Sequence, residues 1–184
     1  MKVVNLFAGP GTGKSTTGQI LAGLLSIGGY RVELVPEFAK FATFANNQAA
    51  LSDQIYMFGK QENRLHVLKS QGFDFVIMDG PLPIALLYTP QDYYRHYEPL
   101  VMEVFKSYDN FNVMLRANPA LAYQQHGRTQ SQPESALLSL KLEELLQGHG
   151  IPLEYELVRP QLPLVLYERL TGKKAPSLEL LETA

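Results

Sequence analysis

The residues best suited to chemistry lie near the amino terminus, in the segment Ala8–Thr16 (AGPGTGKST). Its glycines allow successive backbone N–H groups to point into one concavity, where they can bind the oxygens of an anion. Lys14 adds a mobile positive charge, and the Ser15 hydroxyl adds an oxygen ligand for a divalent cation. We therefore expect this segment to bind a phosphate chain together with Mg²⁺.

The sequence on either side of this segment supports that expectation. Residues 2–7 (KVVNLF) are a short apolar run typical of a buried strand, and residues 14–26 carry leucines at helical spacing. The segment thus matches the P-loop pattern in its strand–loop–helix context, with Ala8 where the first glycine usually stands. The residues predicted to bind ATP are Gly9, Pro10, Gly11, Thr12, Gly13, Lys14, Ser15 and Thr16.

Each polar side chain of this motif has an expected role. Lys14 contacts the β- and γ-phosphates, the Ser15 hydroxyl contacts Mg²⁺, and Thr16 lies near the α-phosphate. The amino terminus of the following helix adds partial positive charge.

Strand and helix patterns alternate along the rest of the chain. We predict strands at residues 2–7, 30–35, 73–78, 111–115 and 152–158, and helices at 14–26, 50–71, 91–107, 134–147 and 163–171. This alternation predicts an α/β, three-layer domain with a mostly parallel five-stranded sheet. We assign residues 1–158 to a P-loop kinase core with a polar lid loop at about 118–132, and residues 159–184 to a C-terminal helical extension.

A charged residue follows each of the first four predicted strands: Lys14, Glu37, Asp79 and Arg116. Ligands of an open parallel sheet bind beyond the carboxyl ends of its strands, so these side chains are candidates for one site. Asp79 follows the apolar run FVIM, which predicts an acid that holds Mg²⁺ with Ser15. The alternative is an aspartate that only begins a turn before Gly80 and a proline.

Three further residues are candidates for catalysis. Glu37 can accept a proton from an attacking hydroxyl, or it can simply favour the amino terminus of a helix. Arg128, in the polar loop, and Arg116 can stabilise charge on the transferred phosphoryl group. For both arginines the alternative is a solvent-exposed side chain.

The segment 53–64 (DQIYMFGKQENR) contains the candidates for binding an acceptor. Gln54 and Gln61 lie on one helical face, and their amides can bind the edge of a base through paired donor and acceptor groups. Lys60 and Arg64 lie one turn apart and can face an acceptor phosphate. We expect Ile55, by contrast, to lie on the apolar face of this helix, with the polar side chains pointing elsewhere. A solvated helix face is the alternative for the four polar residues.

A cluster of tyrosines at Tyr93, Tyr94 and Tyr97 leaves two interpretations open. The rings can stack on a base, or they can pack a helix against the core.

Composition limits the classes of function. The net charge is −2, from 16 basic and 18 acidic residues, which argues against coating nucleic acid through bulk charge but leaves a local basic groove open. The absence of cysteine excludes disulfides and thiol catalysis. We expect no membrane span, no signal peptide and a cytoplasmic location. The sequence leaves monomer and homodimer both open.

Several segments together resemble a known group of proteins. NLFAGPGTGKSTT, VELVPEFAK, LSDQIYMFGKQ, VIMDGPL and the Gly-Arg pair at 127–128 resemble the small AAA-type ATPase or kinase proteins of tailed phages, which are similar to the ribosylnicotinamide-kinase-like P-loop group. The resemblance covers about residues 1–158 and implies a nucleotide-kinase sheet with strand order 2-3-1-4-5.

The resemblance also implies roles for particular residues. Deoxyribonucleoside kinases, among the wider relatives, have a glutamate base after the second strand, which corresponds to Glu37. They also have a glutamine that binds the base, which corresponds to Gln54 or Gln61. They carry Glu-Arg-Ser after the third strand, where this chain has Asp79, Gly80 and Pro81, and this departure weighs against a free nucleoside as acceptor.

The predicted function is an ATP- and Mg²⁺-dependent kinase that transfers the γ-phosphoryl group to a hydroxyl of a nucleoside-like acceptor. Resemblance to phage 5-hydroxymethyluridine DNA kinases makes the 5-hydroxymethyl group of that base in DNA the most specific expectation, as a step in thymidine hypermodification. Two alternatives remain: a kinase for a free nucleoside or nucleoside monophosphate, and an ATPase or nucleotide-dependent switch. A GTPase is disfavoured because LRANPA follows the fourth strand in place of Asn-Lys-x-Asp.

Overall fold

A computed structural model describes residues 1–120 and 131–176 and contains one sheet of five parallel strands. The strands are β1 (Lys2–Phe7), β2 (Val32–Val35), β3 (Phe75–Met78), β4 (Asp109–Arg116) and β5 (Glu154–Leu157). Their order is β2-β3-β1-β4-β5, which confirms the predicted sheet. β1 is the central strand, so the loop that follows it opens at the middle of the carboxyl edge.

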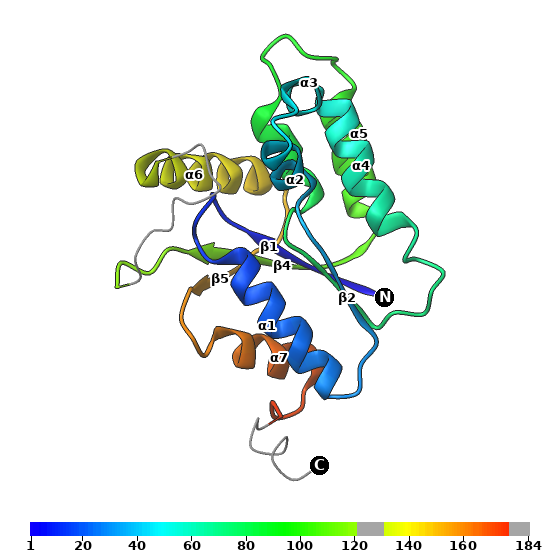
Figure 1. The fold of residues 1–184 in the computed structure, drawn as a ribbon, viewed down its shortest axis with the longest axis vertical. Helices are drawn as coiled ribbons and strands as arrows, with labels where there is room; N and C mark the ends of the chain where they lie inside the picture. The colour runs from blue at the N-terminus through cyan, green and yellow to red at the C-terminus, as the bar shows by residue number, and fades with distance from the viewer. Residues whose placement is uncertain (121–130, 177–184) are drawn as a thin grey trace.

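Helices cover both faces of the sheet (Figure 1). They are α1 (Lys14–Ile27), α2 (Phe38–Phe44), α3 (Gln48–Ser52), α4 (Gln54–His66), the 3₁₀ helix η1 (Leu82–Tyr88), α5 (Tyr97–Lys106), α6 (Gln132–Gly148) and α7 (Leu162–Thr171). α1 and α7 lie on one side of the sheet, and α4, α5 and α6 lie on the other. No helix in the described part of the chain is long and apolar enough to cross a membrane.

The alternation of side chains along the strands produces two cores. Val3 of β1 packs with Phe58 of α4 and Phe105 of α5, whereas the next residue, Val4, packs with Leu21 of α1 on the opposite face. Strands that are buried on both faces read as continuous apolar runs, which is why residues 2–7 and 73–78 were recognisable from sequence.

The segment between β2 and β3 differs from the prediction of one long helix at 50–71. Two helices, α3 and α4, occupy it, and they are separated at Asp53. The Asp53 side chain accepts a hydrogen bond from Tyr56 N at 2.9 Å, so this residue caps a new helix instead of continuing the old one. α2 and η1 were not predicted, and the helix expected at 91–107 begins only at Tyr97.

α7 lies in the region assigned from sequence to a C-terminal extension. Its residues Leu162, Leu166 and Tyr167 are buried in the same core as Leu21 and Leu25 of α1. The described part of that region therefore packs as a layer of the domain.

Candidate functional site

The loop between β1 and α1 has the backbone conformation that an anion cradle requires. Gly11 and Gly13 have φ angles of 82° and 108°, in the left-handed region where a side chain is strained. Gly13 is also the N-cap of α1, so the free N–H groups of the first helical turn open into the loop. The geometry fits binding of a phosphate chain at a helix amino terminus.

Lys14 folds back across this loop. Its Nζ donates hydrogen bonds to Ala8 O at 2.9 Å and Gly9 O at 3.2 Å, and the side chain is buried. Thr12 Oγ1 donates to the same Gly9 carbonyl at 2.9 Å. The ammonium group is thus already held at the mouth of the loop, where phosphate oxygens can replace the carbonyl partners.

Ser15 and Asp79 meet although they lie on different elements. Ser15 Oγ donates a hydrogen bond to Asp79 Oδ2 at 2.6 Å, and Asp79 is only 5% exposed. Within residues 1–120 and 131–176, Asp79 Oδ1 is the single buried side-chain nitrogen or oxygen that lacks a hydrogen-bond partner. An orphaned carboxylate oxygen beside a hydroxyl fits Mg²⁺, which takes few protein ligands and completes its shell with water and phosphate oxygens.

The first half of the loop is held by α6, a contact that the sequence analysis missed. Gly9 N donates to Ser139 Oγ at 2.8 Å, and the Ser135 hydroxyl donates to the Pro10 carbonyl. A Cβ atom at Gly9 would overlap the Ser135 backbone carbonyl, so this position has no room for a side chain. Serines four residues apart on a helix share one face, and only that spacing in the predicted helix could have indicated the contact.

Glu37 lies two residues after the end of β2 and is the N-cap residue of α2, but it makes no side-chain capping hydrogen bond. Its place at the amino terminus of α2 fits the alternative interpretation, in which its negative charge favours that helix end, and its role as a base stays a prediction. A Cβ atom built on Gly80 would lie 2.9 Å from Glu37 Cγ and 3.1 Å from its Cα, so the two residues are in close contact. The dipeptide Asp79-Gly80 consequently touches Ser15 through one residue and Glu37 through the next.

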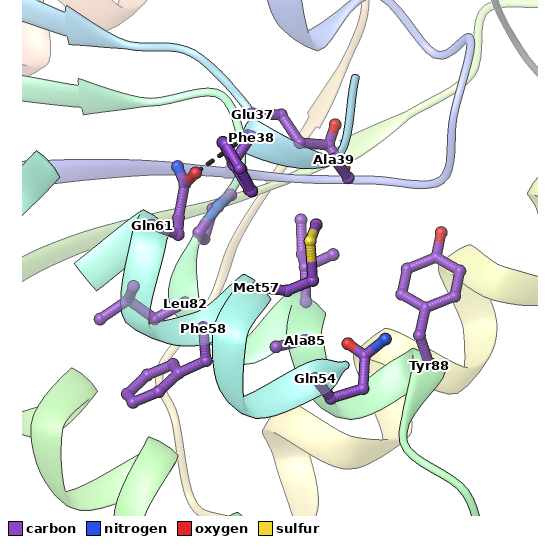
Figure 2. A pocket seen from close by; sticks show the side chains of 13 residues that line it. Glu37, Phe38, Ala39, Gln54, Met57, Phe58, Gln61, Leu82, Ala85 and Tyr88 are labelled. Carbon is purple, nitrogen blue, oxygen red and sulfur yellow. Dashed lines mark hydrogen bonds between the residues drawn. The ribbon is translucent and has the colours of Figure 1, made fainter. Parts of the chain in front are cut away.

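A pocket opens beside Glu37 (Figure 2). Its walls come from α2, α4, the turn after β3, and η1; the lining residues are Glu37, Phe38, Ala39, Gln54, Met57, Phe58, Gln61, Gly80, Pro81, Leu82, Ile84, Ala85 and Tyr88. No lysine or arginine belongs to this lining, as far as the described residues extend. The pocket therefore suits a largely apolar, uncharged group.

The two glutamines predicted to bind an acceptor both reach this pocket. Gln54 and Gln61 are buried, with 5% and 7% of their surface exposed, whereas Ile55 is 51% exposed. The expectation that Ile55 lies on the apolar face, with the glutamines pointing elsewhere, is therefore wrong. α4 packs its glutamine-bearing face against η1 and α2, with Met57 and Phe58 between the glutamines.

The two amides are used differently. Gln61 Oε1 accepts from Phe38 N at 3.0 Å and its Nε2 donates to Pro36 O at 3.3 Å, so it binds backbone at both ends. Gln54 Nε2 donates to Leu51 O at 2.9 Å. In Figure 2 the Gln54 amide lies on the Tyr88 side of the pocket, away from Gln61.

Tyr88 faces Glu37 across the pocket. Burial, together with the nearby negative charge of Glu37, raises the pKa of the Tyr88 phenol to about 12. The phenol therefore stays protonated at neutral pH and can donate a hydrogen bond. The sequence analysis did not single out this residue because η1 was not predicted.

Three of the four predicted cationic side chains, Lys60, Arg64 and Arg116, do not line the pocket. Lys60 Nζ lies 5.4 Å from the centre of the Tyr56 ring, and Arg64 Nη1 donates to Pro36 O at 3.1 Å. Arg116 Nη2 forms an ion pair with Glu143 Oε1 at 2.7 Å. Arg128 lies outside the described residues, and the roles of Arg116 and Arg128 at ATP stay predictions.

Two of the three clustered tyrosines, Tyr93 and Tyr97, pack a helix, whereas Tyr94 is exposed. Tyr97 is buried, and its hydroxyl donates to Gln54 O at 2.6 Å. The Tyr93 hydroxyl accepts from Ile55 N at 3.3 Å. These two side chains hold the first turn of α4, which carries Gln54.

Comparison with known proteins identifies the family. A family model described as an AAA domain matches residues 3–156. The chain belongs to this AAA-domain family. A search of curated proteins finds no match to the chain.

Two solved structures share the fold of this AAA-domain chain. One is NadR in complex with NAD and AMP-PNP, with a TM-score of 0.71 and 17% identity over 96% of this chain. This chain spans about half of that protein, 51% of its length. The other is deoxyadenosine kinase from M. mycoides with bound dATP, with a TM-score of 0.58 and 19% identity over 94% of this chain and 100% of that one.

Proposed function

We propose that this AAA-domain chain transfers the γ-phosphoryl group of ATP to a hydroxyl of an uncharged, nucleoside-like acceptor. The observation that carries the proposal is the placement of Asp79-Gly80: Asp79 bonds Ser15 of the phosphate-binding loop, and Gly80 contacts Glu37 at the pocket. A donor site and an acceptor pocket thus share one dipeptide. Phosphoryl transfer depends mainly on such positioning and on stabilisation of charge.

Each residue at this junction has a defined task in the transfer. The N–H groups of the loop and Lys14 bind the phosphates, and Ser15 and Asp79 hold Mg²⁺. When bound, that ion neutralises charge on the β- and γ-phosphates. The oxygen of the acceptor hydroxyl forms a bond to the γ-phosphorus, and Glu37 accepts the proton of that hydroxyl. The bond between that phosphorus and the bridging oxygen breaks, and ADP leaves with the bond's electrons.

The pocket favours a neutral acceptor. Its only charged lining residue among those described is the acidic Glu37, which would repel an acceptor phosphate placed there. Gln54 and the protonated Tyr88 supply polar groups on otherwise apolar walls, a combination that suits a base or a sugar. The lining thus favours a nucleoside-like group over a nucleoside monophosphate.

The most specific form of the proposal is a kinase for the 5-hydroxymethyl group of 5-hydroxymethyluridine in DNA. Support comes from exposed aromatic rings on α2, a helix whose first residues line the pocket. Phe41 and Phe44 are 50% and 58% exposed, and the Arg64 guanidinium lies 5.6 Å from the Phe41 ring. Rings with nearby cations suit the bases and phosphates that flank a base extruded into a pocket.

A free deoxynucleoside is the second candidate acceptor. The observation that favours it is the structural match to the M. mycoides deoxyadenosine kinase, which spans 100% of that protein. In this case the exposed rings of α2 would have no part in acceptor binding.

The test is transfer of labelled phosphate from [γ-³²P]ATP to a panel of acceptors. The panel holds free nucleosides, nucleoside monophosphates, unmodified DNA and DNA that contains 5-hydroxymethyluracil, with the Lys14→Ala variant as control. We expect the label in an acceptor whose reacting hydroxyl lies on a base or sugar without a neighbouring monophosphate group. Label on modified DNA alone supports the specific form, and label on a free nucleoside supports the second candidate. Labelled inorganic phosphate with no labelled acceptor would contradict the kinase and favour an ATPase or switch.

A further inference from the structure

Gln61 of α4 binds the backbone on both sides of Glu37. Its Oε1 accepts from Phe38 N at 3.0 Å, and its Nε2 donates to Pro36 O at 3.3 Å. Figure 2 shows the amide of Gln61 directed at the backbone of Phe38, away from the open part of the pocket near Tyr88. The side chain therefore holds the two peptide groups between which the Glu37 side chain is attached.

The first of these bonds satisfies a backbone donor at the start of α2. The N–H of Phe38 is the first of the four donors that have no partner within that helix. The side chain of an N-cap residue accepts from the second or third of these donors, and Glu37 makes no such bond. Gln61 therefore supplies, from another helix, the acceptor for the peptide N–H that directly follows Glu37.

Two more contacts hold the same peptide groups. Arg64, one turn after Gln61 on α4, donates from Nη1 to Pro36 O at 3.1 Å. Gly80 closes the opposite side, since a Cβ atom there would lie 2.9 Å from Glu37 Cγ. The segment from Pro36 to Phe38 is thus fixed between α4 and the turn after β3.

We propose that Gln61 is a positioning residue that orients Glu37 toward the acceptor hydroxyl, and that Gln54 and Tyr88 bind the acceptor. This inference rests on the proposed function, because it takes Glu37 as the group that accepts the proton. An amide that reads a base edge must offer its donor and its acceptor together. Gln61 can do so only by giving up its bonds to Phe38 N and Pro36 O.

The kinetic test compares three variants. Gln61→Met keeps the length of the side chain and removes both hydrogen bonds, and Gln61→Glu keeps the acceptor but loses the donor to Pro36 O. The matched control is Gln54→Met, on the same helix and lining the same pocket. We expect Gln61→Met to lower kcat by about 10- to 100-fold, the scale of a small misplacement of a reacting group, with little change in the KM of the acceptor.

Selectivity between acceptors distinguishes a residue that positions Glu37 from a residue that binds the base of the acceptor. The ratio of kcat/KM for two acceptors that differ at the base edge should stay the same in Gln61→Met and change about 10-fold or more in Gln54→Met. In a Glu37→Gln background, Gln61→Met should cause no further loss, because it acts through Glu37. A changed selectivity ratio in Gln61→Met, or a full additional loss in that background, would overturn the proposal.

A second measurement does not depend on activity. Amide hydrogen exchange of Phe38, followed by NMR, should be about 10-fold faster or more in Gln61→Met than in the unmodified protein and unchanged in Gln54→Met. Equal exchange in Gln61→Met would refute the clamp on Glu37 even if the kinase were active. If the unmodified protein transfers no phosphate but Phe38 exchange responds as expected, the proposed function fails, and the role of Gln61 in kinase positioning falls with it. Unfolding curves for each variant identify any that fail to fold, and the milder Gln61→Glu then replaces Gln61→Met.

Discussion

The phosphate-binding loop and the acceptor pocket are neighbours built in different ways. The loop is one continuous segment between β1 and α1, with its shape set by glycine backbone and by contacts to α6. The pocket is assembled from α2, α4 and the segment after β3, and its polar groups are placed by bonds between separate elements. The phosphate-binding loop, the donor half of the site, therefore depends mainly on local sequence. The acceptor pocket, the acceptor half, depends on packing between separate elements.

This difference has a functional consequence. Substitutions in the loop should affect every reaction of ATP, while substitutions around the pocket should affect transfer to the acceptor and leave ATP binding in place. Among the described residues, the dipeptide Asp79-Gly80 contacts both the loop and Glu37 at the pocket, so changes at these two residues show where the halves join.

The largest effect is expected at Lys14. Lys14→Ala removes the cation held at the mouth of the loop and should lower the rate of phosphoryl transfer by about 10³-fold. ATP hydrolysis should fall in parallel, and the unfolding midpoint should change little. Lys60→Ala removes the same charge at a residue outside the pocket lining and is the matched control. Its rate of phosphoryl transfer should stay within about 2-fold of that of the unmodified protein. Near-normal transfer by Lys14→Ala would mean that Lys14 and its loop do not stabilise the transferred phosphoryl group.

A smaller loss is expected at Asp79. Asp79→Asn keeps the size of the side chain but removes the negative charge beside Ser15, so transfer should fall by about 10²-fold and require more Mg²⁺. The rate measured as a function of Mg²⁺ concentration tests this. An unchanged Mg²⁺ dependence would mean that the orphaned oxygen of Asp79 does not serve a cation.

Gly80 gives a sharper separation of the two halves. Gly80→Ala places a methyl group against Glu37 and should shift its carboxylate, which lowers kcat for transfer by about 10-fold. Binding of ATP, measured by calorimetry, should remain within about 2-fold because the contact lies on the pocket side. A loss of ATP affinity equal to the loss of transfer would show that the halves are not separable.

The smallest effect concerns stability at high pH. Burial raises the pKa values of the Tyr97 and Tyr108 phenols above their ordinary value of about 10. A raised pKa means that the folded state holds the proton more tightly, so this stabilisation is complete below pH 10 and is lost as the pH rises above it. Because Tyr97 bonds α4, amide exchange in α4 should increase before exchange in α1 between about pH 10 and 11.

A phenylalanine variant serves as control for this pH effect. Tyr97→Phe should show a flatter decline of the free energy of unfolding above pH 10 than the unmodified protein. Parallel declines would mean that ionisation of Tyr97 is not coupled to folding.

The two halves also differ in how far they could be predicted from sequence. The strands and the loop could be predicted because their signals, apolar runs and a glycine pattern, are local, whereas the strand order was implied by the family resemblance. The partner of Ser15 could be placed at a strand end, since parallel strands end at one edge of the sheet.

The pocket could not be predicted to the same degree. Hydrophobic periodicity placed Phe58 and Leu65 of α4 in the core, as observed, but Ile55 is apolar yet exposed, while Gln54 and Gln61 are polar yet buried. Each buried amide is satisfied by a backbone group from another part of the chain or a preceding turn, such as Phe38 N or Leu51 O. Contacts between elements determine which amide forms hydrogen bonds within the protein and which can bind an acceptor, and no sequence pattern shows this.

The most direct test of the account is single-turnover transfer from [γ-³²P]ATP by Glu37→Gln, measured beside ATP binding with an acceptor identified from the panel. We expect a loss of about 10²- to 10³-fold in the transfer rate, with an ATP dissociation constant within about 2-fold of that of the unmodified protein. Transfer at the normal rate by Glu37→Gln would contradict it, because the acceptor pocket would then lack the base around which it is built.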